Sequence, residues 1–478
     1  MNSSILKKNY IYTLLRLFSS FLFPLISFPY LSRVLGPEKI GNVEYFFSIA
    51  QYGSLIAMLG TSNYAIREIG KIRTEKKKLK RFFSEILLIR FANSVIIAII
   101  LFFILEYTNV NSYMIGITIL YLVLQIGVID WLFQGIEDVK SITIRILLSK
   151  LVMLILIFLF IKSKDEYILY YLLLTIDSAA SLVYGLYYVT KNIGFTSKNL
   201  NFTRHFRPMF FMFSVQFSIS IYTLVDKIML GALSSNAEVG YYTAALKLVK
   251  IFQATITSLG LVLLPRLSYY AQHENQKEYS ALINKTLNFV LLTAIPLASG
   301  IFLVAEESIV LFAGKDYVNA IIPIRILSLT ILIVALGSFF GTQVLLSINR
   351  EKEFFIAVFI GAAVNITLNF LLIPKYSSIG ASTATLFTEF VVALGCFYFA
   401  FKNCKALSFP RLNVVLKYLF LSLAFVFAGK MLPGDNLILL FISKILLGAI
   451  VYLGGLLLFR DVFFLKMLTS VKNMLLKK

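Results

Sequence analysis

The stretch Phe213–Ile251, FSVQFSISIYTLVDKIMLGALSSNAEVGYYTAALKLVKI, contains two apolar segments of helix length joined by a short polar turn. Four charged residues, Asp226, Lys227, Lys247 and Lys250, lie inside these segments or at their edges. An ion inside a bilayer costs free energy, so ionisable residues at that depth usually serve a function. The stretch therefore predicts membrane-spanning helices with charged groups that face the interior of the protein.

The composition of the whole chain supports a membrane protein. Of its 478 residues, 59% are hydrophobic and 14% are charged, and its mean hydropathy is +0.84. A soluble globular protein has about 25% charged residues, so a soluble fold is excluded. The apolar runs extend over about 20 residues, which favours helices over the alternating strands of about 10 residues in a membrane barrel. We predict an all-α polytopic membrane protein.

The apolar runs give about 14 candidate spans, each long enough to cross the hydrocarbon core. The predicted spans begin near Tyr10, Ile40, Ile86, Tyr113, Arg145, Ile168, Met209, Val239, Thr286, Ile321, Phe354, Ile379, Val414 and Leu437.

The net charge of +21 carries topological information. With the N-terminus in the cytoplasm, the most basic loops all fall on the cytoplasmic side, as the positive-inside rule requires. These loops are Arg67 to Arg81, Lys191 to Arg207, Arg266 to Lys285, Lys402 to Arg411 and the tail from Arg460. We therefore predict a multi-pass membrane protein with both termini in the cytoplasm, and no nucleic-acid partner.

A weak internal repeat divides the chain. Leu35-Gly36 and Ile40-Gly41 in the first half correspond to Leu230-Gly231 and Val239-Gly240 in the second, and an arginine follows each second glycine at the same distance. Six predicted spans separate the copies, so both have the same orientation, as in parallel transporter repeats. We predict a six-helix lobe over residues 1–207, a second over 208–401, and two extra helices with a basic tail over 402–478.

Basic residues within the predicted spans indicate the candidate site. Arg16, Lys247 and Lys250 lie far from the helix ends and favour a water-filled cavity. Lys247 and Lys250 are three residues apart, so they share one helix face and could bind a pyrophosphate jointly. A shorter distance to the helix end favours snorkelling to the interface for Arg90, Lys150, Arg325 and Lys417.

Acidic residues within the spans are fewer. They are Glu44, Asp177, Asp226 and Glu389. Because basic groups outnumber them, the cavity favours an anionic substrate over an organic cation. Asp226 could pair with Lys247, either as a structural pair or as a site where a bound proton or sodium ion releases the lysine. Asp177 and Glu389 are further candidates for coupling to H⁺ or Na⁺.

Other motifs favour structural roles. Asn365 and Asn369 are expected to bond between helices, and Trp131 is expected at the membrane interface. The two histidines, His205 and His273, fall in predicted loops. No metal-ligand spacing, nucleotide-binding glycine loop or catalytic constellation occurs in the sequence. We expect no metal, no cofactor and no enzymatic activity.

Three stretches carry a family resemblance: Pro29–Pro37 (PYLSRVLGP), Asp130–Glu137 (DWLFQGIE) and Asp226–Gly231 (DKIMLG). They resemble the signature stretches of O-antigen and capsule repeat-unit flippases, the Wzx-type branch of the superfamily that includes lipid II flippases and multidrug and toxic compound extrusion transporters. The resemblance covers nearly the whole chain.

The resemblance implies two lobes around a cationic cavity, alternating access and movement of an undecaprenyl-pyrophosphate-linked oligosaccharide from the cytoplasmic to the periplasmic leaflet. Arg16, Glu44, Asp226, Lys247 and Lys250 would map to that cavity. Implied partners are membrane lipids, a polysaccharide polymerase and a chain-length regulator. Two alternatives remain open: an organic cation exporter of the same superfamily, and a membrane glycan polymerase or ligase that uses outer-loop residues such as Lys315 and Asp316.

Overall fold

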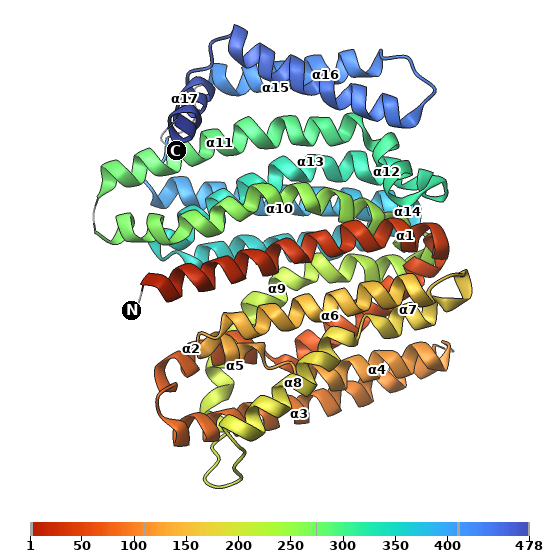
Figure 1. Cartoon of the computed structure of the whole chain (residues 1–478), viewed down its shortest axis with the longest axis vertical. Helices are drawn as coiled ribbons and strands as arrows, with labels where there is room; N and C mark the ends of the chain where they lie inside the picture. Colours follow the sequence, from red (N-terminus) through yellow and green to blue (C-terminus); the bar gives the residue numbers. More distant parts are fainter. Residues whose placement is uncertain (1–2, 109, 274, 409–411, 477–478) are drawn as a thin grey trace. The chain divides into compact units, whose positions relative to one another are not determined.

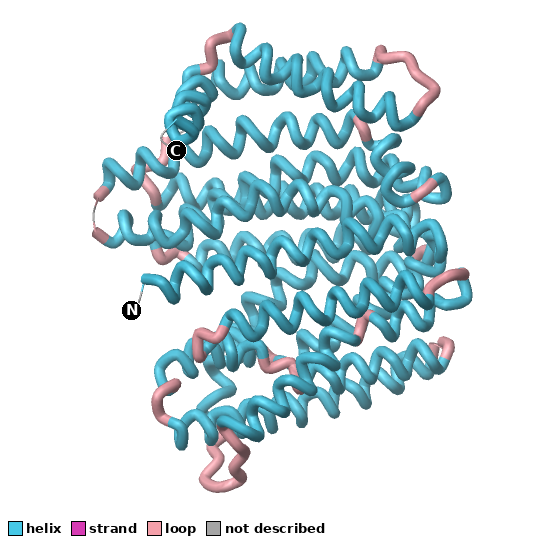
Figure 2. The backbone as a smooth tube through the Cα atoms, in the orientation of Figure 1, coloured by secondary structure: helices cyan, strands magenta, loops and turns pink. Residues whose placement is uncertain are grey.

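The computed structural model describes residues 3–108, 110–273, 275–408 and 412–476, and within these residues the chain forms helices and no strand (Figures 1 and 2). The all-helical fold class is therefore confirmed. The chain divides into two compact units, Met1–Gly240 and Tyr241–Lys478.

Unit 1 is built around its first helix, which packs against α3, α4, α6 and α9. The helices of this unit are α1 (Ser3–Met58), α2 (Thr61–Ile72), α3 (Lys76–Tyr107), α4 (Ser112–Ile126), α5 (Asp130–Gly135), α6 (Val139–Phe160), the 3₁₀ turn η1 (Lys164–Glu166), α7 (Tyr167–Leu173), α8 (Ile176–Asn192) and α9 (Thr203–Leu233). The boundary between the units falls in α10 (Asn236–Gln272).

In unit 2, α13 packs against both α11 and α14, and α15 packs against α11 and α16. Its elements after α10 are α11 (Gln276–Leu303), α12 (Ala305–Ala313), η2 (Lys315–Ala320), α13 (Ile321–Ser338), the π-helical η3 (Phe339–Leu345), η4 (Leu346–Ile348), α14 (Glu351–Asn403), α15 (Leu412–Lys430), α16 (Leu437–Leu458) and α17 (Val462–Leu476).

Two of the longest helices contain a break. Gly36 interrupts α1 with φ 74° and ψ 172°, and Ser377 interrupts α14 with φ 48° and ψ −125°. The spans predicted to start near Ile40 and Ile379 each begin directly after one of these breaks. Each helix thus consists of two helical segments, as the sequence predicts.

The glycines of the sequence repeat lie where two backbones approach closely. A Cβ atom on Gly41 would lie 1.6 Å from the carbonyl oxygen of Asn236, and one on Gly240 would lie 2.1 Å from the carbonyl oxygen of Pro37. Any larger residue would therefore separate the break in α1 from the start of α10. The repeated glycines of the two halves meet at this contact.

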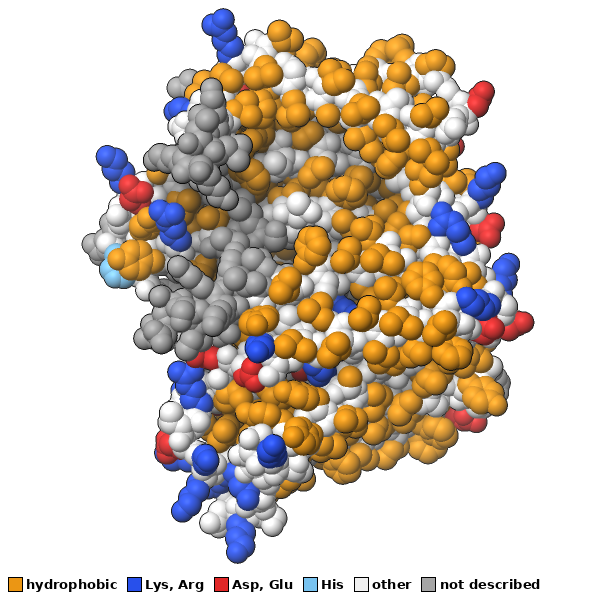
Figure 3. Space-filling model, in the orientation of Figure 1, with side chains coloured by type: hydrophobic (Ala, Val, Ile, Leu, Met, Phe, Trp, Pro, Cys, Tyr) orange, Lys and Arg blue, Asp and Glu red, His pale blue; other side chains and the backbone are white. Residues whose placement is uncertain are grey.

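Ten helical segments among the described residues are long and apolar enough to cross a membrane. Large hydrophobic side chains cover the visible face of the molecule (Figure 3). The chain is a multi-pass membrane protein. The count of 14 spans stays a prediction, as do the lobe boundaries at residues 207 and 401.

Two segments outside the predicted spans are helical. The stretch from Glu306 to Asn319, between the ninth and tenth predicted spans, forms most of α12 and η2. The basic segment after Arg460 continues as α17.

Candidate functional site

Unit 1 gathers charged side chains from four helices between α1 and α8. The charged cluster of unit 1 consists of Arg16 on α1, Asp130 on α5, Arg145 and Lys150 on α6, and Asp177 on α8. Arg145 and Lys150 lie on the same helix, and the packing of α6 against α1, α5 and α8 brings the other three residues to them.

The strongest contact in this cluster joins Asp130 and Arg145. A guanidinium nitrogen of Arg145 lies 2.9 Å and 3.0 Å from the two carboxylate oxygens of Asp130, and a second donates to the carbonyl oxygen of Asp177 at 3.2 Å. The side chain of Arg145 is 7% exposed. A pair buried this deeply is held by its geometry and additional hydrogen bonds, because desolvation offsets much of the Coulomb attraction.

Arg16 and Asp177 complete the cluster. Arg16 is half-buried and lies within electrostatic range of Asp130. A carboxylate oxygen of Asp177 accepts a hydrogen bond of 2.6 Å from Ser149, and the ammonium group of Lys150 lies within its electrostatic range. Three basic and two acidic side chains therefore form a site with a surplus of positive charge, which suits an anion.

Glu44 forms a second ion pair within unit 1. A carboxylate oxygen of Glu44 on α1 accepts from the ammonium group of Lys227 on α9 at 2.7 Å, and these side chains are 7% and 16% exposed. Lys227 is therefore held inside the protein, because Glu44 binds its ammonium group between two packed helices. Asp226, its neighbour in sequence, is buried.

Unit 2 contains the remaining predicted site residues. Lys247 is half-buried and Lys250 is exposed, both on the uninterrupted helix α10. Glu389 is half-buried on α14. The structure thus brings Arg16 and Asp177 each within electrostatic range of Asp130, and places Glu44 in another pair. The proposed Asp226–Lys247 pair would join the two units and stays a prediction, as do the substrate and ion-coupling roles.

Arg90 and Trp131 correct two sequence-based expectations. Arg90 is buried in unit 1 and donates to Thr61 Oγ1 at 2.7 Å, Ser62 Oγ at 2.8 Å and the Val128 carbonyl oxygen at 2.8 Å. Its guanidinium also lies over the ring of Trp131, which is buried against Phe83. Arg90 does not snorkel, because its partners lie inside the protein, and Trp131 belongs to the core instead of the interface.

Three other polar residues also have partners within their own unit. Lys417 pairs with the buried Asp461, so it ends at a carboxylate instead of in lipid headgroups. Asn369 donates to Asn365 at 3.2 Å along the same helix, α14, and bonding of this pair to another helix stays a prediction.

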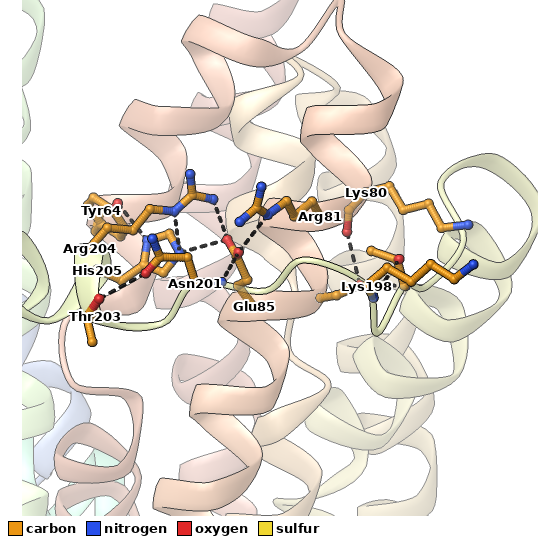
Figure 4. Close-up of polar contacts among 11 residues, drawn as sticks. Tyr64, Lys80, Arg81, Glu85, Lys198, Asn201, Thr203, Arg204 and His205 are labelled. Atoms are coloured by element: carbon orange, nitrogen blue, oxygen red, sulfur yellow. Dashed lines mark hydrogen bonds and ion pairs between the residues drawn. The ribbon is translucent and has the colours of Figure 1, made fainter.

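A polar network centred on Glu85, here called the Glu85 network, joins the N-terminal part of α3 to the start of α9 (Figure 4). The buried Glu85 accepts from Arg81 at 3.1 Å, from the backbone N–H of Asn201 at 2.7 Å and from Arg204. His205 lies between Glu85 and Tyr64, 2.9 Å and 2.8 Å from their oxygens. His205 is therefore a buried residue of the first turn of α9 and not a loop residue.

His205 is neutral in this setting. Burial lowers the pKa of the imidazole below its usual value of 6.5, although Glu85 acts in the opposite direction. Since a carboxylate only accepts, Nε2 donates to Glu85 and Nδ1 accepts from the Tyr64 hydroxyl. Sequence analysis missed this network because its members are spread from Tyr64 to His205, and only the basic character of both segments was visible.

These features define a class: a multi-pass, all-helical membrane protein with buried charged clusters. The fold is similar to that of two groups of solved transporters. The lipid II flippase MurJ in an inward closed conformation aligns with a TM-score of 0.74 and 19% identity over 95% of this chain and 99% of that chain. An inward-facing multidrug resistance MATE family transporter aligns with a TM-score of 0.62 and 14% identity over 80% and 93%.

The sequence comparisons identify the family. The sequence profile of the family described as polysaccharide biosynthesis protein matches residues 6–271, and the chain belongs to this family. A putative O-antigen transporter of Escherichia coli (strain K12) is 28% identical over 403 residues, which is 82% of this chain and 95% of that protein. The sequence resemblance to repeat-unit flippases of the superfamily that contains MurJ and MATE transporters is confirmed.

Proposed function

We propose that this protein is a flippase that moves an undecaprenyl-pyrophosphate-linked oligosaccharide from the cytoplasmic to the periplasmic leaflet by alternating access. The observation that carries the proposal is the positive surplus in the charged cluster of unit 1, within a chain whose relatives include an O-antigen transporter. Guanidinium and ammonium groups donate several charge-assisted hydrogen bonds to phosphate oxygens.

In this mechanism, Arg16, Lys247 and Lys250 bind the pyrophosphate, while the polyprenyl tail remains in lipid. Lys227 donates to Glu44 at 2.7 Å. Separation of this ion pair would leave the ammonium group of Lys227 available to the phosphate oxygens of the substrate. Asp177, Asp226 and Glu389 are the proposed coupling groups for an H⁺ or Na⁺ gradient. The proposed location is the bacterial inner membrane with both termini in the cytoplasm, where a polysaccharide polymerase and a chain-length regulator would act on the product.

The proposal is tested by glycan export in cells that lack the chromosomal copy. Lys247→Ala with Lys250→Ala should abolish export at a normal protein level, because the pyrophosphate loses both ammonium groups. Lys277→Ala with Lys352→Ala removes the same charge from exposed positions and should leave export intact. Full export by the Lys247/Lys250 variant would contradict the assignment.

The two alternative functions give different outcomes in the same cells. An organic cation exporter would confer drug resistance that depends on Asp226 or Asp177, with no change in surface glycan. A polymerase or ligase would make short glycans or leave them unattached when Lys315 and Asp316 are replaced. Relatives named as transporters and flippases favour the flippase over an enzyme.

A further inference from the structure

An apolar pocket opens on the surface of unit 1, and no charged side chain is among its lining residues. It has a volume of about 320 Å³ and is lined by hydrophobic side chains and glycines of α3, α8, the end of α4 and the loop after α8. Leu88, Phe91, Leu186 and Phe195 are among its lining residues, and each is more than 40% exposed. Since α3 and α8 belong to candidate membrane spans, the exposed side chains of Leu88, Phe91 and Leu186 face hydrocarbon.

The pocket lies directly beside the basic end of α3. Lys80 precedes Phe83, the first pocket residue, by less than one helical turn. Leu87, another pocket residue, lies about 10 Å from Lys80 along the helix axis, at a rise of about 1.5 Å per residue. The pocket therefore begins at the predicted cytoplasmic interface and extends into the outer part of the acyl-chain region.

The loop after α8 brings basic groups to the mouth of the pocket. Gly194 has φ +74°, and a Cβ atom there would lie 3.1 Å from the ammonium nitrogen of Lys80. The next residue, Phe195, lines the pocket and packs on Phe83 with ring centroids 5.9 Å apart. Glycine favours this left-handed backbone conformation, and any larger residue would require the Lys80 side chain to shift.

Two further lysines, Lys191 and Lys198, lie on the same segment and are exposed. Figure 4 shows Lys80 and Lys198 extending to the same side, away from Glu85. Figure 3 shows basic side chains gathered at this end of unit 1 beside a hydrophobic surface. Within the described part of the chain, no ion pair of Lys80, Lys191 or Lys198 is present, whereas Arg81 pairs with Glu85.

We propose that this pocket and its lysines form a binding site for an anionic phospholipid of the cytoplasmic leaflet. One acyl chain occupies the pocket between α3 and α8, and the headgroup phosphate lies between Lys80 and Lys198. The apolar pocket with lysines that form no ion pair among the described residues matches the two ends of such a lipid, because basic pockets between spanning helices bind anionic headgroups. The bound lipid would fix the Gly194 loop, which the Glu85 network already ties to α3.

Native mass spectrometry of the full-length protein tests this site. Delipidated protein is incubated with an equimolar mixture of phosphatidylglycerol and phosphatidylcholine. The wild type should retain phosphatidylglycerol preferentially. Lys80→Gln with Lys198→Gln should weaken retention by about 5-fold for each ammonium removed, whereas Lys277→Gln with Lys352→Gln should not.

The acyl pocket is tested separately. Leu186→Trp places a larger side chain at the pocket and should lower retention of both lipids, while Ile104→Trp at an exposed position nearer the other end of α3 should not. Equal retention of both lipids by the wild type, or equal behaviour of the two lysine variants, would overturn the proposal. Displacement of phosphatidylglycerol by polyprenyl phosphate would instead assign the pocket to the substrate tail. Lipid retention is measured without translocation, so this result is independent of the proposed flippase activity.

Discussion

At the scale of single residues, buried ions in this protein have specific partners. Arg90, Arg145 and Lys227 each lie at membrane depth or close to it, and each donates to an oxygen within its own unit at 3.0 Å or less. A charge in a bilayer is tolerated when it faces the protein interior and is paired. These residues therefore stabilise helix contacts in addition to any role in transport.

Arg90 offers a clear test of this view. Arg90→Met keeps most of the side-chain volume but removes donors to Thr61, Ser62 and Val128. The loss should cost about 2–4 kcal/mol, because buried acceptors remain without partners. The thermal denaturation temperature in detergent should fall clearly. Arg67→Met, at an exposed position on α2, should change it little, and equal melting of the two variants would show that Arg90 is not a structural anchor.

Residue-scale contacts were the least predictable from sequence. Position along a span suggested that Arg90 would snorkel, but the direction of its side chain depends on α2 and on Val128, which are brought close only by folding. The charged cluster was missed for the same reason. In the sequence, Asp130 was noted only as part of the DWLFQGIE stretch and Arg145 only as the start of a predicted span, and nothing indicated that their side chains meet. Arg16, Glu44 and Asp177, which were selected from the sequence, lie on helices of unit 1, and their functional roles stay predictions.

At the scale of helices, the sequence was more informative. Apolar runs of span length predicted the long helices, and the breaks in α1 and α14 fall where one predicted span ends and the next begins. The repeated glycines, Gly41 and Gly240, lie at a close contact between helices. The sequence repeat did not reveal that these two glycines contact each other.

The Gly41 contact predicts a large effect of a single methyl group. Gly41→Ala would place a Cβ atom 1.6 Å from a carbonyl oxygen, so α1 and the start of α10 must separate. We expect a reduced yield of monodisperse protein and a lower denaturation temperature. Gly116→Ala in α4 is the matched control, because no atom lies within 4 Å of that Cβ position and alanine favours the helix. If both variants fold equally well, the contact at Gly41 is not required.

At the scale of the whole molecule, composition and charge distribution were sufficient to predict an all-helical, multi-pass protein. The family followed from three short stretches and is confirmed by the match over residues 6–271. The two compact units do not coincide with the predicted lobes, since α9 belongs to unit 1 by its packing on α1 and α2. The sequence repeat indicates that the two halves cross the membrane in the same orientation. The compact units instead group the helices that pack against one another, so the two divisions describe different properties.

The central claim is that this chain translocates a pyrophosphate-linked oligosaccharide across a bilayer. The most direct measurement reconstitutes the purified protein in vesicles that contain the undecaprenyl-pyrophosphate-linked glycan in both leaflets, and follows its accessibility to an added glycosidase. With an imposed ion gradient, the wild type should make the glycan accessible beyond the fraction present in the outer leaflet, and Lys247→Ala with Lys250→Ala should not. Accessibility equal to that of protein-free vesicles would contradict the account.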